Sequence, residues 1–228
     1  MIIETNRRRS QTWWLPSGVT KSDVLAAYQF KGAASQTASY YNLVDSSVYQ
    51  LYDDYWDVSW TTDKGVFIEG NIGFGLEGFD QGYVSCAIRF SDVDVNANTS
   101  IGLTSPIDGY YLFAKTADLY SYYKTPGFSM ATAASKPIYY SDTQMANGTL
   151  GYTRSLGKLY QNGQSETLTE DTWGGGVISR TASIGNATRY HSTVPLTMGT
   201  VYIQAAVFYS VALSDAQHAE LAEKMNAI

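Results

Sequence analysis

The C-terminal end of the chain is the part of the sequence that most constrains the fold. Residues 201–209 read Val-Tyr-Ile-Gln-Ala-Ala-Val-Phe-Tyr, with apolar side chains at both odd and even positions. Successive side chains of a strand point to opposite faces, so this run predicts a strand that is covered on both sides. Ser214 and Gln217 then have the spacing of a capping box, and Leu221 and Met225 recur at helical spacing. We therefore expect a buried strand followed directly by a short C-terminal helix.

Short strand-like runs follow one another along the rest of the chain. Turn residues separate them at intervals of about 8–12 residues, a spacing typical of a sandwich or barrel. The runs are 24–30, 66–68, 83–90, 110–114, 119–123, 138–140, 149–154, 158–161, 164–169 and 182–185. There is no repeat of fixed period and no internal linker. We expect one all-β domain at residues 21–228, preceded by an N-terminal arm at residues 1–20.

The sharpest local signal is the Asn-Gly pair at residues 162–163, which lies between two strand-like runs. Both central positions of a type I′ turn require positive φ, and this pair of residues favours such a turn. The pair therefore predicts a tight antiparallel hairpin.

Three stretches together resemble the laminin-G-like members of the concanavalin A-like lectin/glucanase superfamily, of the type found in bacteriophage virion proteins. The stretches are residues 25–43, the Leu-Tyr-x-Asn-Gly motif within 158–164, and the terminal strand with Ala-Leu-Ser-Asp-Ala-Gln at 212–217. Their order and separations agree across residues 24–226. The resemblance implies a jelly-roll sandwich of two antiparallel sheets with a short C-terminal helix, in which the last strand pairs beside the first.

The charge of the chain bears on its partners. The formal net charge is −6 and only 16% of residues are charged. Nucleic-acid binding needs clustered Lys and Arg, so we expect no nucleic-acid partner. No stretch approaches the ~18 apolar residues of a membrane helix, so we expect no membrane association. The start of the chain also lacks the apolar segment of a signal peptide.

The one basic cluster, Arg7, Arg8 and Arg9, lies in the predicted arm together with Trp13 and Trp14. Neighbouring side chains of a strand point to opposite sides, so we expect one indole to cap the domain while the other contacts a partner. These five residues are our candidates for docking the chain onto other subunits.

Catalytic and metal-binding patterns are missing from the sequence. The glucanases of the superfamily carry Glu-x-Asp-x-Glu on one strand, and no such run occurs here. The alternation from Asp92 to Asn98 resembles half of a calcium loop, but Ala97 and Leu103 depart from that pattern. A polar turn and a calcium site remain as alternatives there, and we assign no cofactor and no metal ligand. We expect a buried structural thiol at Cys86, a surface position for His218, no catalytic residue and no enzyme activity.

Aromatic residues with polar neighbours are the remaining candidates for ligand binding. They lie in or beside predicted loops, where a Tyr or Trp ring can stack on the apolar face of a sugar. They are Tyr49 and the seven that we take as candidate ligand contacts, Tyr52, Tyr55, Trp56, Tyr110, Tyr111, Trp173 and Tyr190. The alternative is that most of them fill the core or an intersubunit contact.

The expected function is a non-enzymatic structural or accessory virion protein of a bacteriophage, either a capsid decoration or a tail component. Its expected location is the virion, its expected partners are other virion proteins and further copies of itself, and it would mediate assembly and host-surface attachment. The alternative is a carbohydrate-binding module or tail receptor-binding protein that recognises cell-surface glycan. A glycan-cleaving enzyme is a third and more distant hypothesis.

Overall fold

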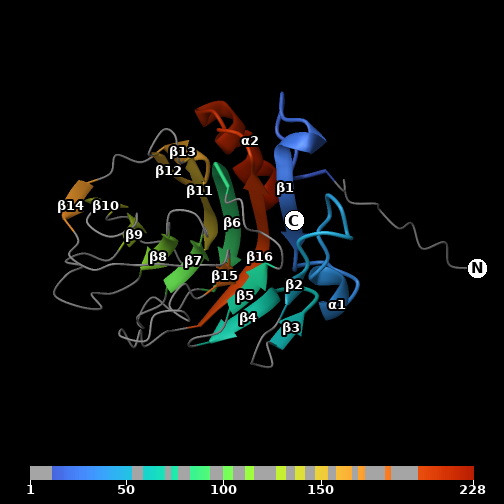
Figure 1. The fold of residues 1–228 in the computed structure, drawn as a ribbon. Coiled ribbons are helices and arrows are strands. Elements are labelled where there is room, and N and C mark those ends of the chain that lie inside the picture. The colour runs from blue at the N-terminus through green and yellow to red at the C-terminus, as the bar shows by residue number, and fades with distance from the viewer. Residues whose placement is uncertain are drawn as a thin grey trace, which may run out of the picture.

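The computed structural model describes residues 12–52, 59–69, 73–76, 83–92, 100–104, 111–115, 127–131, 137–141, 147–153, 158–165, 169–172, 183–185 and 200–228. Within these residues the strands form two eight-stranded antiparallel sheets. The helical elements are η1 (Lys21–Asp23), α1 (Gln36–Ser39) and α2 (Asp215–Asn226). The fold is the expected jelly-roll sandwich with a short C-terminal helix (Figure 1).

The first sheet has the order β13 (Gln164–Ser165), β12 (Lys158–Gln161), β11 (Gly148–Thr153), β6 (Ser85–Ser91), β16 (Thr200–Tyr209), β4 (Gly65–Glu69) and β3 (Ser59–Thr61), and β1 (Val24–Gln29) also pairs with β16. The second sheet has the order β14 (Thr169–Thr172), β10 (Pro137–Ser141), β9 (Gly127–Ala131), β8 (Tyr111–Lys115), β7 (Ser100–Thr104), β15 (Ser183–Gly185), β5 (Gly73–Leu76) and β2 (Leu51–Tyr52). The predicted pairing of the last strand beside the first is confirmed.

The central strand is β16, which pairs with β6 on one side and with β4 and then β1 on the other. A register shift between Ile203 and Ala205 adjusts the alternation of its side chains. Val201, Ile203, Ala206 and Phe208 face the core between the sheets, whereas Ala205, Val207 and Tyr209 face α2. The prediction of a strand covered on both faces is therefore confirmed.

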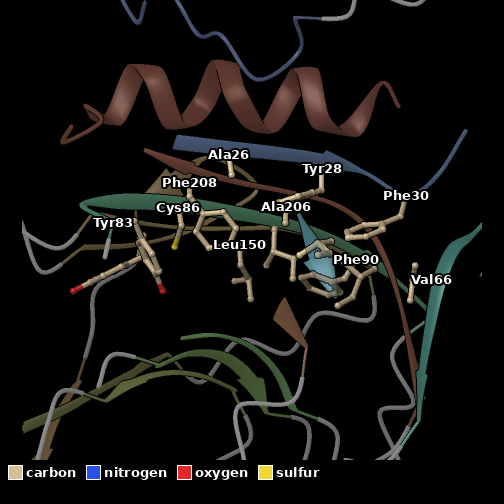
Figure 2. Packing of buried hydrophobic residues seen from close by; sticks show 14 of the residues in the cluster. Ala26, Tyr28, Phe30, Val66, Tyr83, Cys86, Phe90, Leu150, Ala206 and Phe208 are labelled. Carbon is tan, nitrogen blue, oxygen red and sulfur yellow. The ribbon is translucent and has the colours of Figure 1, made fainter. Parts of the chain in front are cut away.

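The core between the sheets lies on the face of the first sheet opposite to α2, as Figure 2 shows. Cys86, Ile88 and Phe90 alternate into this core from β6. Burial raises the pKa of the Cys86 thiol well above its usual range. Cys86 is thus the buried structural thiol that the sequence predicted.

A row of small residues crosses the face of the first sheet beneath α2. A row that runs across β11, β6, β16 and β1 consists of Gly151, Ala87, Val207 and Ala27. A Cβ atom added at Gly151 would lie 2.6 Å from Nδ1 of His218. The helix can approach the sheet this closely only because β11 has no side chain at that position.

Two predicted local motifs are present. Ser214 caps α2, with Gln217 N donating to its Oγ at 3.3 Å and Ser214 N donating to Oε1 of Gln217 at 2.8 Å. Asn162 and Gly163 join β12 to β13 with φ values of 49° and 80°, as a type I′ turn requires. The strand expected at 119–123 lies outside the described residues, and β5 lies in a Gly-rich segment that was not among the predicted strand-like runs.

Residues 12–20 pack against the domain. Residues 12–14 form a turn, and both Trp13 and Trp14 are buried in the cluster beneath α2. The alternation rule of a strand does not apply to a turn, so both indoles face the same core and neither is exposed to a partner. Arg7, Arg8 and Arg9 lie outside the described residues, and the domain boundary at residue 20 stays a prediction.

Candidate functional site

An open groove of about 1140 Å³ lies beside the edge of β1 that faces away from β16. One side of the groove is formed by η1 and the start of β1, at residues 20–25. The other side is formed by the loop at residues 40–50, which we call the edge loop and which follows α1 (Figure 1).

None of the helices that the structure describes has the length and apolar character needed to span a membrane.

The edge loop is fixed to β1 by the side chain of Asn42, which is only 1% exposed. Its Oδ1 accepts from Ala27 N at 3.0 Å and its Nδ2 donates to Leu25 O at 3.2 Å. The same carboxamide bonds to the loop itself, at Val44 N and Val48 O. Asn42 therefore pairs with the edge of β1 as a neighbouring strand would and sets the course of the loop at the same time.

Further hydrogen bonds hold the rest of the edge loop. Leu43 N donates to Ala27 O at 2.8 Å, and Oδ1 of Asp45 accepts from the amide and the hydroxyl of Ser47 at 2.9 and 2.7 Å. Tyr49 has a φ of 53°, and its carbonyl accepts a hydrogen bond from the buried Tyr28 hydroxyl. The loop is thus ordered before any ligand arrives, which lowers the entropic cost of binding.

The edge loop exposes apolar side chains. Tyr41, Leu43 and Val48 are between 41% and 43% exposed, and they are the exposed large hydrophobic residues of the part of the chain that the structure describes. All three line the groove. A concave site with an exposed aromatic ring and a few polar groups is typical of ligand binding.

Polar and charged side chains complete the groove. Lys21, Ser22 and Thr20 lie on the η1 side, and Asp45 and Ser46 lie on the edge-loop side. Hydrogen bonds from the side chain and backbone of Ser47, with a smaller contribution from Lys21, lower the pKa of Asp45. Asp45 is therefore ionised near neutral pH.

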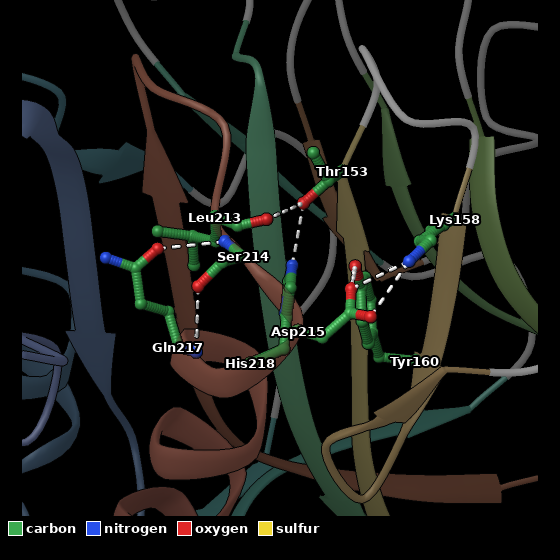
Figure 3. A network of polar contacts seen from close by, with 8 residues as sticks. All are labelled: Thr153, Lys158, Tyr160, Leu213, Ser214, Asp215, Gln217 and His218. Atoms are coloured by element: carbon green, nitrogen blue, oxygen red, sulfur yellow. Dashed lines mark hydrogen bonds and ion pairs between the residues drawn. The ribbon is translucent and has the colours of Figure 1, made fainter.

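A second cluster of polar groups lies between α2 and the first sheet (Figure 3). Oγ1 of Thr153 donates to the Leu213 carbonyl at 3.2 Å and lies 2.7 Å from Nε2 of His218. A carbonyl only accepts, so the hydroxyl hydrogen of Thr153 is used there and Nε2 of the neutral imidazole carries a hydrogen. The His218 ring also stacks on Tyr160, with 3.8 Å between the ring centroids.

His218 is 2% exposed, so its expected surface position is wrong. Its Nδ1 lies against Gly151 on β11. Burial lowers the pKa of His218 to about 3, although the nearby Asp215 carboxylate opposes this shift. This burial could not be predicted from the sequence, because α2 places His218 over β11, a strand that is distant in the chain.

The rim of this cluster is an exposed ion pair. Lys158 Nζ lies 2.9 Å from both carboxylate oxygens of Asp215, and the Tyr160 hydroxyl donates to Oδ1 at 2.7 Å. Hydrogen bonds from Lys158 and Tyr160 lower the pKa of Asp215. The cluster holds α2 on the sheet, and its central His–Thr pair is closed to a substrate, so we assign it a structural role.

The structure does not bring together the predicted ligand contacts that it describes. Tyr52 lies on β2, at the edge of the second sheet, and Tyr111 lies on β8. Three strands separate β2 from β8, so these residues are roughly 19 Å apart at a strand spacing of about 4.8 Å. The remaining candidates lie outside the described residues; they are Tyr55, Trp56, Tyr110, Trp173 and Tyr190.

At the candidate calcium loop, the structure describes Asp92 at the end of β6. Its carboxylate forms an ion pair of 3.3 Å with Lys64, and its backbone amide donates to Oδ1 of Asn147 at 2.9 Å. Residues 93–98 lie outside the described part of the chain. The described residues contain no cluster of three His, Cys, Asp or Glu side chains that could hold a metal.

Three residues that line the groove, Tyr41, Lys21 and Asp45, were not among the predicted contacts. Tyr41 lies within residues 25–43, where it served only as part of a family motif. Its signal in the sequence is an aromatic ring in a stretch, residues 41–48, where apolar and polar residues follow neither a helix nor a strand period.

Comparison with known proteins places the fold. No protein-family model matches the sequence, and no curated protein sequence matches it. A mutant of Trypanosoma rangeli sialidase displaying trans-sialidase activity shares 13% identity over 91% of this chain and 34% of its own, with a TM-score of 0.57. Trypanosoma rangeli sialidase in complex with sialic acid shares 12% identity over 89% of this chain and 33% of its own, with a TM-score of 0.56. The receptor binding domain of botulinum neurotoxin D shares 14% identity over 89% of this chain and 53% of its own, with a TM-score of 0.55.

The chain thus spans about a third of the length of the sialidases and about half of the toxin domain. Identities this low show a shared fold. They support the lectin-like jelly roll and leave the bacteriophage context without support. The expectation that the chain is not an enzyme is contradicted, because sialidases are among the solved structures similar to it. The lack of the glucanase Glu-x-Asp-x-Glu run was therefore not a sufficient reason to exclude catalysis. One fold can carry different sites, and the function depends on the site.

Proposed function

We propose that this chain is a carbohydrate-binding domain that recognises cell-surface glycan through the groove between η1 and the edge loop. The observation that carries the proposal is the gathering of the exposed Tyr41, Leu43 and Val48 on one hydrogen-bonded loop that lines this groove. An aromatic ring beside apolar and polar groups suits a sugar, which has an apolar face and a rim of hydroxyls.

The comparisons support this proposal over the virion role. One similar structure is a sialidase in complex with sialic acid, which is a sugar, and another is a receptor binding domain. The expected assembly into a bacteriophage capsid or tail, with other virion proteins or further copies as partners, stays a prediction. Detection of the chain in purified particles would support it, and its absence from them would contradict it.

The test is a glycan array with the whole chain and two variants of Tyr41. Tyr41→Phe keeps the ring and should keep binding, whereas Tyr41→Ala removes the stacking surface and should lose it by more than about tenfold. Lys64→Ala is a matched surface change outside the groove and should bind as the unmodified chain does. An array without hits, or equal binding by the Ala variant, contradicts the proposal.

A further inference from the structure

Two opposite charges face the same groove from its two sides. Lys21 lies on η1 and Asp45 lies on the edge loop, and both side chains are exposed. Among the described residues, Nζ of Lys21 forms no hydrogen bond or ion pair, although its charge contributes to the lowered pKa of Asp45. The bonds from Ser47 both go to Oδ1 of Asp45, which leaves Oδ2 available. The groove therefore offers one cationic donor and one anionic acceptor beside the Tyr41 ring.

Asp45 disfavours an acidic ligand in the groove. It lines the groove and is ionised, because hydrogen bonds from Ser47 lower its pKa. Lys21 is the single cationic side chain that lines the groove. A sugar carboxylate would gain from Lys21 but would meet repulsion from Asp45, and such repulsion is a common source of specificity.

A pair of neighbouring sugar hydroxyls suits this arrangement. A hydroxyl is both donor and acceptor, so one can donate to Oδ2 of Asp45 while the next accepts from Nζ of Lys21. Hydrogen bonds to charged groups are stronger than those between neutral groups. The apolar face of the same ring can then lie on Tyr41.

Resting on the proposed function, we propose that Lys21 and Asp45 are specificity-determining residues that make the groove select a neutral sugar with adjacent free hydroxyls and reject its acidic counterpart. Tyr41 supplies sugar affinity in general, whereas the Lys21–Asp45 pair supplies the choice between neutral and acidic sugars.

The test uses sugars that differ only in charge. The methyl glycosides of glucose, mannose and galactose are each compared with the matching uronic acid, by NMR titration of the whole chain at pH 7. We expect each neutral sugar to bind about fivefold more tightly than its uronate at low salt. The difference should shrink as the salt concentration approaches about 1 M, where the Debye length falls to about 3 Å.

Two variants identify the residues responsible. Asp45→Asn keeps an acceptor for Ser47 but removes the negative charge, so the uronates should gain and the ratio should fall toward one. Lys21→Gln should weaken both classes and the uronates more. Lys64→Gln, a lysine change outside the groove, should leave the ratio unchanged.

The outcomes separate this inference from the function on which it rests. The charge-pair proposal is overturned if the unmodified chain binds uronates as tightly as neutral sugars. It is also overturned if Asp45→Asn leaves the ratio of neutral-sugar to uronate affinity unchanged. In both cases sugar binding itself stands. Failure of every sugar, neutral and acidic, to bind overturns the carbohydrate function and the specificity proposal together.

Discussion

Two segments cover the first sheet, and they do so in opposite ways. α2 lies over its outer face, and the edge loop lies along the open edge of β1 (Figure 1). A buried polar side chain helps to hold each of them, His218 for α2 and Asn42 for the edge loop. However, α2 turns Leu221 and Met225 toward the sheet, whereas the edge loop leaves Tyr41, Leu43 and Val48 exposed.

This difference makes α2 part of the scaffold and the edge loop part of the proposed recognition surface. The apolar side chains of α2 already contact this chain, so its polar network serves to position the helix. The edge loop is held by hydrogen bonds and by the packing of Tyr40, Val44 and Tyr49 against the core clusters. Its other large apolar side chains, Tyr41, Leu43 and Val48, stay exposed. Changes in α2 should therefore affect stability, and changes in the edge loop should affect binding.

Replacing Leu221 by Ala tests the scaffold half of the comparison and has the largest expected effect. Leu221 is fully buried between α2 and the sheet. Its truncation should lower the free energy of unfolding by roughly 2–5 kcal/mol, measured by urea denaturation. The folded fraction should keep its sugar affinity, and a parallel loss of affinity would mean that the two segments are coupled.

Replacing Asn42 by Ala should affect both properties. It leaves Ala27 N and Leu25 O without their side-chain partner, at a cost of roughly 1–3 kcal/mol for each buried group. The loop should also lose its order, so sugar binding should disappear in the same titration. Asn226→Ala is a matched control at the exposed end of α2, and it should cost less and leave binding intact. Binding that survives in Asn42→Ala would show that the loop does not need this side chain.

The pH dependence of stability should report on His218. Its folded pKa of about 3 lies below its unfolded value of 6.5, so the unfolded chain takes up the proton first. The stability that depends on a neutral His218 is fully present above pH 6.5 and is lost as the pH falls toward 3. Over this range the free energy of unfolding falls by at most about 1.4 kcal/mol per pH unit because of this group.

Urea denaturation at several pH values measures how the free energy of unfolding changes with pH. His218→Gln should remove the part of this pH dependence that is due to His218. The slope due to carboxylates should remain in the variant. An equal acid sensitivity of both proteins would show that His218 is not neutral in the folded state.

Replacing Tyr41 by Ala should have the smallest effect on stability. The side chain is 43% exposed, so the free energy of unfolding should change by no more than about 0.5 kcal/mol. The same variant should lose sugar binding, which makes it the inverse of Leu221→Ala. A large loss of stability would place Tyr41 in the scaffold instead.

Several elements followed from local patterns in the sequence. The alternation in residues 201–209, the Ser214–Gln217 cap and the Asn162–Gly163 turn each depend on residues close in the chain, and each is present as predicted. Such patterns also located β1, β6 and β11 within one or two residues. The Gly-rich β5 was missed, because its composition resembles that of a turn.

The candidate site could not be predicted in the same way. Asn42 pairs with Ala27 across fifteen residues, and His218 meets Thr153 across sixty-five. Trp13 and Trp14 share one core because the chain turns there, which their adjacency alone argued against. Burial and hydrogen-bond partners of these side chains depend on which segments meet in space.

Local patterns were enough to predict the all-β class, the two-faced last strand, its capped helix and the hairpin, because periodicity, capping and turn chemistry act over a few residues. Contacts between distant segments place α2 over a glycine on β11, close the edge of β1 with Asn42 and leave Tyr41 exposed. Burial and polar pairing depend on such contacts, so local patterns could not predict them.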